Sequence, residues 1–212
     1  MSQYALPITL PAVYAEANFV VSECNKAAYN QIVTWPAWQA LLISGASGSG
    51  KTHLGHIWAA RADAAIIDCK KQSVSPDHIN RNLWLDNAEF CNEEILFHTL
   101  NYSKEQKVSL LLTSALPAGQ LPFTLPDLTS RLRALPTAHI DAPDDDVLSA
   151  VLYKQFADRQ IKISDDVITY LLTHTERSFT AITNMVDKLD TQMLETKRSL
   201  TIPFIKHVLS IL

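Results

Sequence analysis

Short apolar runs alternate with helical spacing over the first two thirds of the chain. The apolar runs predict buried strands at residues 41–43, 64–68, 83–86, 108–113 and 137–140. Apolar residues spaced three and four apart predict helices at 25–32, 52–61, 92–100 and 128–132. Strands that alternate with helices indicate an α/β fold with a parallel sheet and right-handed crossovers.

The pattern changes near residues 141–143, beyond which only helical periodicity is present. The predicted helices of this part cover 144–158, 165–173, 177 or 178 to 194, and a last segment that Thr201 caps. We therefore expect an extended tail at 1–11, an α/β core at 12–142 and a small all-α lid at 143–212.

The composition is that of a folded, mildly acidic protein. Of the 212 residues, 47% are hydrophobic and 19% are charged, which supports a proper core and argues against disorder. The net charge of −4, without a basic stripe, argues against a protein that binds DNA unaided. No apolar run is long enough to span a bilayer and no secretory signal opens the chain, so we expect a cytoplasmic protein. The three cysteines, Cys24, Cys69 and Cys91, share no metal-type spacing, and we expect reduced thiols.

A complete phosphate-binding loop follows the first predicted strand. Its sequence fits G-x-x-x-x-G-K-[ST] and holds three of the five glycines of the chain. The backbone of such a loop closes around phosphate, the side chain of Lys51 reaches the β- and γ-phosphates, and the hydroxyl of Thr52 ligates Mg²⁺. The candidate nucleotide-binding residues here are Gly45, Ser47, Gly48, Ser49, Gly50, Lys51, Thr52 and His53. The competing interpretation is an ordinary glycine- and serine-rich turn.

Polar residues at the ends of two later strands fit the same chemistry. Asp86 ends the third strand, where an acid can complete the Mg²⁺ shell, although it can also be a simple turn residue. Asn87 follows it and is a poor base, so we expect slow unaided hydrolysis; Glu89 can compensate only if the backbone turns it inward. Thr113 ends the fourth strand, where its hydroxyl can bind the γ-phosphate or the attacking water.

Two arginines are candidates for contacts with phosphate. Arg131 lies between the proline-rich loop and the fifth strand, where it can project from the subunit edge as an arginine finger toward a neighbour's γ-phosphate. Arg177, at the start of a lid helix, can touch the phosphates from the other side. A solvated surface arginine is the ordinary alternative for Arg131.

Together these residues resemble the DnaA/Hda branch of the AAA+ ATPases. The segments that carry the resemblance are 19–29, 45–54, 85–87, 112–114, 130–132 and 201–206. Leu85-Asp86-Asn87 is closer to the "IDN" of Hda than to the "IDD" of DnaA, and residues 201–206 resemble the closing "TIPFVK" helix of Hda. The resemblance covers nearly the whole chain and implies an AAA+ core with a helical lid.

The tail resembles the clamp-binding peptide of Hda, of the form Gln-Leu-x-Leu-Pro-Leu. By that resemblance the clamp-binding residues are Gln3, Leu6, Pro7 and Ile8. We expect no helix-turn-helix domain of the kind that reads origin DNA in DnaA, and we therefore expect DNA contact to be indirect, through the clamp.

The position of the family's second sensor arginine has two solutions. Counting back without gaps from residues 200–202 places it at Thr180, whereas the local motif places it at Arg177. We favour Arg177 because an arginine can contact phosphate through its charge and a threonine cannot.

The resemblance implies an Hda-like regulator of the replication initiator. Such a protein binds ADP or ATP with Mg²⁺, docks on the DNA-loaded sliding clamp and presents Arg131 to ATP-bound DnaA, which then hydrolyses its nucleotide. Two other functions stay open: a self-assembling ATPase that remodels nucleic acid, and a non-enzymatic adaptor at the replication fork. The sequence leaves the ligand, ADP or ATP, and homo-oligomer formation undecided.

Overall fold

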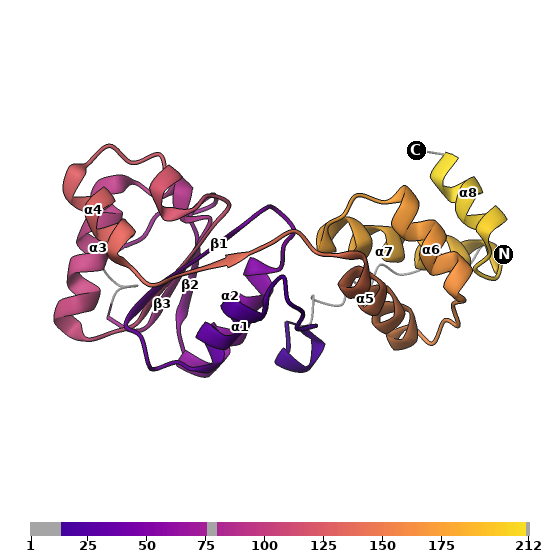
Figure 1. Cartoon of the computed structure of the whole chain (residues 1–212), viewed down its shortest axis with the longest axis horizontal. Coiled ribbons are helices and arrows are strands. Elements are labelled where there is room, and N and C mark those ends of the chain that lie inside the picture. The colour runs from indigo at the N-terminus through magenta and orange to yellow at the C-terminus, as the bar shows by residue number, and fades with distance from the viewer. Residues whose placement is uncertain (1–13, 76–79, 211–212) are drawn as a thin grey trace. The chain divides into compact units, whose positions relative to one another are not determined.

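The computed structural model describes residues 14–75 and 80–210. The chain divides into two compact units, of which the first covers Tyr14–Ala142 and the second includes Pro143–Leu212. Figure 1 shows a sheet flanked by helices in the first unit and helices alone in the second. The predicted clamp-binding residues, Gln3, Leu6, Pro7 and Ile8, lie outside the described residues.

The sheet of the first unit is parallel, as predicted. Its strands are β1 (Ala40–Gly45), β2 (Ala65–Asp68), β3 (Leu83–Asp86), β4 (Leu110–Ser114) and β5 (Thr137–Ile140), in the order β2-β3-β4-β1-β5. Ile43 of β1 is in register with Thr113 of β4, and Leu85 of β3 with Leu112 of β4. The carboxyl ends of β1, β3 and β4 therefore meet at one edge beside the phosphate loop, where Asp86 is the last residue of β3 and Thr113 the second-last of β4.

Helices cover both faces of this sheet because the strands are apolar on both sides. The helices of the unit are α1 (Lys26–Val33), α2 (Lys51–Ala62), α3 (Glu93–Gln106) and α4 (Pro126–Ala134), with 3₁₀ turns at η1 (Glu16–Asn18), η3 (Ala88–Phe90) and η4 (Ala118–Gln120). Leu41 and Ile43 pack in one core with α1 and α2, whereas Leu42 packs in the other with α3 and α4. Figure 1 shows these two helical layers on either side of the strands.

The third helix is longer than the apolar pattern predicts. The pattern ends at residue 100, but α3 continues to Gln106 and stops at Lys107, whose φ is 56°. Ser103 lies on the inner face of this last turn and is buried, and its hydroxyl is satisfied by the backbone oxygen of Leu100. A polar residue thus occupies a core position that the hydrophobic pattern could not reveal.

The second unit is the predicted four-helix lid. It consists of α5 (Asp145–Asp158), α6 (Asp165–His174), α7 (Phe179–Thr196) and α8 (Ile202–Ser210) around its own apolar core. The side chains of Asp144 and Ser178 cap α5 and α7 by accepting bonds from Val147 and Ala181. Ser164 occupies the cap position of α6 as predicted, but its side chain makes no cap bond.

Candidate phosphate-binding site

The loop between β1 and α2 has the backbone of an anion cradle. Gly48 and Gly50 have φ of 73° and 99°, conformations that residues with a Cβ rarely adopt. Gly50 is the N-cap of α2, and no side chain caps this helix start. The first amides of α2 therefore lack the side-chain acceptor that helix starts normally have, which leaves a place for an anion.

The side chains of the loop fit a phosphate as well. Ser49 Oγ is buried and, within residues 14–75 and 80–210, has no hydrogen-bond partner. Lys51 Nζ donates to the backbone oxygens of Gly45 and Ala46, both at 2.7 Å. Burial lowers the pKa of Lys51, and the carboxylates of Asp86 and Glu89 oppose that shift. A half-buried cation and an unsatisfied hydroxyl in one loop are suited to binding an anion.

Asp86 is the centre of a hydrogen-bonded group at the edge of the sheet. Thr52 Oγ1 donates to its Oδ2 at 3.2 Å, and Thr113 Oγ1 donates to its Oδ1 at 2.6 Å. The backbone N–H of Asn87 donates to Oδ1 at 3.0 Å. The two residues predicted to hold Mg²⁺, Thr52 and Asp86, are thus in contact, and their oxygens suit a hard cation.

One member of this group, Trp84, was not identified from the sequence. Its indole Nε1 donates to Thr113 Oγ1 at 2.9 Å, and its ring packs against His56 with the ring centroids 5.0 Å apart. Trp84 is buried in β3, two positions before Asp86. The hydrophobic pattern indicates only a core residue there, and its polar contact depends on strand pairing.

Asn87 and Glu89 point in different directions after β3. Asn87 has a left-handed backbone, with φ of 56°, and its Nδ2 donates to Asp68 Oδ1 at 2.9 Å. Glu89 lies in η3, and its Oε1 accepts from the backbone N–H of Ala115, just beyond β4. The other carboxylate oxygen of Glu89 is buried and unpaired within the described part of the chain. The backbone therefore turns Glu89 back toward the strand ends, which was the condition for a compensating acid.

His53 belongs to an aromatic cluster on α2. Its Nε2 lies 3.1 Å from the backbone oxygen of Ala15, and the ring of Phe19 meets it edge-on. One turn along, His56 stacks on Tyr14 with the centroids 4.1 Å apart. Burial lowers the pKa of both histidines. This cluster fixes the start of the segment 19–29 against the helix that follows the phosphate loop.

Arg131 lies on the exposed side of α4. Its guanidinium carbon is 5.3 Å from the centroid of the Phe97 ring on α3. It forms no ion pair with any residue that the structure describes, whereas Arg61, Arg81 and Arg159 all do. Arg131 is thus a cation held by an aromatic face and open to an outside anion.

The second unit carries both candidates for the second sensor, Arg177 and Thr180. Arg177 is exposed, and its Nη2 lies 3.2 Å from Asp145 Oδ2 at the start of α5. Thr180 is exposed in the first turn of α7. The choice between them as the second sensor therefore stays a prediction.

Comparison with known proteins identifies the lid. Residues 144–209 match the family described as "Hda, lid domain". An uncharacterized protein of Haemophilus influenzae is 29% identical, over 80% of this chain and 80% of that protein.

No helix in the described part of the chain is both long and apolar enough to cross a bilayer.

Solved structures identify the fold. Domain III of the replication initiation protein DnaA from Thermotoga maritima superposes with a TM-score of 0.79 at 19% identity, over 93% of this chain and 95% of that one. AMPPCP-bound DnaA from Aquifex aeolicus superposes with a TM-score of 0.73 at 19% identity, over 90% of this chain and 69% of that one. The chain therefore combines a core with the fold of DnaA domain III and a lid that matches the Hda lid family, and it is similar in both parts to the DnaA/Hda branch of the AAA+ proteins.

Proposed function

We propose that this protein regulates replication initiation by stimulating ATP hydrolysis in DnaA. In this proposal the nucleotide-bound chain docks on the DNA-loaded sliding clamp and inserts Arg131 into the active site of ATP-bound DnaA. It acts in the cytoplasm, at the replisome, and reaches DNA through the clamp. The observation that carries the proposal is the exposed Arg131 guanidinium, which has no ion-pair partner among the described residues.

The phosphate loop supports the nucleotide part of the proposal. ADP or ATP would place its phosphates against Lys51, the uncapped loop amides and Ser49 Oγ, and the last of these has no other partner among the described residues. Thr52 and Asp86 would hold Mg²⁺, which neutralises charge on the phosphate oxygens when bound. The similarity to AMPPCP-bound DnaA agrees with this ligand class. Arg177 would add a contact from the lid.

Arg131 suits a role in trans because its guanidinium packs on an aromatic ring while the residue is exposed to solvent. The Phe97 ring limits where the guanidinium can go, while its donors stay exposed. An arginine that stabilises the transferring phosphoryl group from a neighbouring subunit accelerates hydrolysis by about 10³–10⁵-fold. That range is large enough for one side chain to switch DnaA from its ATP form to its ADP form.

The surroundings of Asn87 agree with a protein whose own turnover is slow. The side chain after Asp86 is an amide engaged with Asp68, so it is neither a base nor directed at a nucleotide. The tether of the proposal is the segment from Gln3 to Ile8, and its support is the peptide motif alone. Clamp docking therefore needs a test separate from that of the arginine.

The decisive experiment measures ATP hydrolysis by DnaA on DNA-loaded clamp, with substoichiometric amounts of this protein. We expect strong acceleration by the natural chain, none by Arg131→Ala, and near-normal acceleration by Arg133→Ala, an exposed arginine of the same helix. Binding of a fluorescent ADP analogue should be equal for all three. Undiminished stimulation by Arg131→Ala would remove the finger from the proposal.

A second experiment separates the tether from the finger. Deleting residues 3–8 should abolish stimulation on the clamp, while Arg131 stays intact and nucleotide binding is unchanged. If the deletion has no effect, the clamp part of the proposal is wrong and the arginine part stands.

Glu89 favours one other function, a self-acting ATPase. Its carboxylate faces the strand ends and has an unpaired oxygen within the described residues, as a base for water requires. Steady ATP hydrolysis by the isolated chain, stimulated by single-stranded DNA, would support that function. Slow hydrolysis unaffected by DNA would exclude it.

A further inference from the structure

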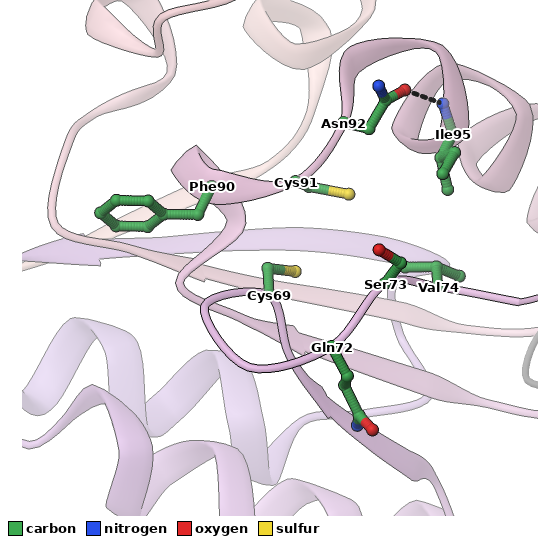
Figure 2. A pocket seen from close by; sticks show the side chains of 8 residues that line it. All are labelled: Cys69, Gln72, Ser73, Val74, Phe90, Cys91, Asn92 and Ile95. Atoms are coloured by element: carbon green, nitrogen blue, oxygen red, sulfur yellow. Dashed lines mark hydrogen bonds between the residues drawn. The ribbon is translucent and has the colours of Figure 1, made fainter.

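Two cysteines that are far apart in the sequence lie side by side in the first unit. Cys69 directly follows β2, and Cys91 directly follows η3. Figure 2 shows both thiols extending into one surface hollow, which Ser73, Val74 and Asn92 also line. The two side chains line the same hollow, and both are free thiols.

Strand pairing produces this proximity. Asp68 is in register with Asp86, and the N–H of Cys69 donates to the backbone oxygen of Asp86 at 2.9 Å. The turn of η3 then brings the chain back, so that Cys91 lies over the end of β2. The ends of β2 and η3 thus place the two cysteines at one hollow.

We propose that Cys69 and Cys91 form a dithiol modification site, which hydrogen peroxide converts into an intramolecular disulfide with Cys91 as the attacking sulfur. The oxidation is independent of the proposed function. It ties the segment after β2 to the turn that carries Glu89, close to the phosphate-binding site.

The surroundings of Cys91 support its assignment as the attacking sulfur. The neighbouring Cys69 thiol and the backbone N–H of Asn92 lower the pKa of Cys91, although burial opposes them. The thiolate is the reactive form of cysteine, and Cys91 is half-buried beside the hollow rather than sealed in the core. Cys24, by contrast, is buried and bonded to Ser22 Oγ at 3.0 Å.

A metal site accounts less well for the pair. In residues 14–75 and 80–210, no three side chains of His, Cys, Asp or Glu are grouped closely enough to hold a metal ion. A structural zinc site needs four ligands of this kind. Two thiols without further ligands are suited to oxidation instead.

The reaction balances with one peroxide. The Cys91 sulfur attacks a peroxide oxygen, the O–O bond breaks, and the departing hydroxide takes the thiol proton as water, which leaves a sulfenic acid. The Cys69 sulfur then attacks the Cys91 sulfur, the S–O bond breaks, and the second hydroxide leaves as water with the Cys69 proton. Two thiols lose two electrons to peroxide, and two waters and one disulfide form.

The test treats the full folded chain with stoichiometric hydrogen peroxide. We expect an intact-mass loss of about 2 Da, the difference between two thiols and one disulfide. Titratable thiols should fall from three to one, and peptide mapping should find Cys69 linked to Cys91. Dithiothreitol should reverse all three changes.

Three variants make the result decisive. Cys24→Ser should still form the disulfide at the normal rate. Cys69→Ser should stop at a sulfenic acid on Cys91, which is about 16 Da heavier and is trapped by dimedone. Cys91→Ser should react far more slowly. Pairing that involves Cys24, links between molecules only, or no loss of thiols would overturn the proposal.

Discussion

The indole Nε1 of Trp84 donates a hydrogen bond to Thr113 Oγ1 at 2.9 Å. This bond engages the threonine oxygen as an acceptor, so its single proton is directed at Asp86 Oδ1, 2.6 Å away. The hydroxyl proposed to sense the γ-phosphate is therefore oriented by a tryptophan in the neighbouring strand. Because all three groups are buried, the orientation does not depend on solvent.

Replacing Trp84 by phenylalanine should destabilise the fold and weaken nucleotide binding together. The aromatic ring is largely kept, but the lost donor leaves a buried hydroxyl partly unsatisfied, at a cost of about 1–3 kcal/mol. Urea unfolding measures the first effect and titration with a fluorescent ATP analogue the second. The matched control is Trp35→Phe, because the Trp35 indole also donates to a hydroxyl, that of Ser109. If both variants bind nucleotide like the natural chain, Trp84 does not position Thr113.

Gly55→Ala should destabilise the protein although the residue is in a helix. Alanine normally stabilises a helix interior relative to glycine by about 1 kcal/mol. Here an added Cβ would lie 2.1 Å from Cζ2 of Trp84, so the ring or the helix must move. Thermal unfolding should show a lower midpoint for Gly55→Ala and little change for Gly119→Ala, where no atom is within 4 Å of the added Cβ. A stabilised Gly55→Ala would contradict the packing of α2 on β3.

Thr52→Val should remove the dependence of nucleotide affinity on Mg²⁺. Valine has nearly the shape of threonine but lacks the hydroxyl that lies beside Asp86. We expect affinity for the Mg²⁺ complex to fall about tenfold, or 1.4 kcal/mol, and affinity in EDTA to change little. Thr52→Ser keeps the oxygen and should behave like the natural chain. Equal losses with and without Mg²⁺ would point to a packing defect instead.

Glu89→Gln distinguishes ATP hydrolysis by this chain itself from the ATP hydrolysis that it stimulates in DnaA. If Glu89 is the base for this chain's own turnover, the amide should reduce intrinsic hydrolysis by about 10²–10⁴-fold, because it cannot accept a proton. Stimulation of DnaA should persist, since that depends on Arg131. An unchanged intrinsic rate measured by phosphate release would show that Glu89 is structural, bonded to Ala115.

Stability should fall as the pH drops below about 6.5. Burial lowers the pKa of His53 and His56 from the ordinary value of 6.5. As the pH falls, the two histidines are therefore protonated in the unfolded chain before they are protonated in the folded protein. The stability that each neutral histidine contributes is fully present above its pKa in the unfolded chain. It is lost as the pH falls from that value toward the lower pKa of the folded protein. Urea unfolding between about pH 7.5 and 5.5 should show this loss, and His56→Phe should reduce it. The control His98→Gln, at an exposed position, should leave the slope unchanged.

Most of the fold could be predicted from the chain's own pattern. β3 and β5 begin and end where the apolar runs predict, and α2 extends the predicted helix by one residue at each end. These elements are continuous in sequence, and their periodicity reflects burial directly. The hydrophobic pattern does not predict the last turn of α3. Ser103 is buried there and its hydroxyl bonds to the backbone, so the turn has no apolar residue to indicate its burial.

The residues of the candidate site also divide into those that the sequence predicts and those that only the tertiary structure brings together. Local sequence alone determined the phosphate loop, with its glycines, Lys51 and Thr52, because one short segment forms the cradle. It also predicted that Asp86 and Thr113 end their strands. It could not show that Trp84 orients Thr113, that Glu89 turns back to Ala115, or that Cys69 meets Cys91. Each of these contacts joins residues on different strands or turns, and only the pairing order of the sheet decides which of them become neighbours.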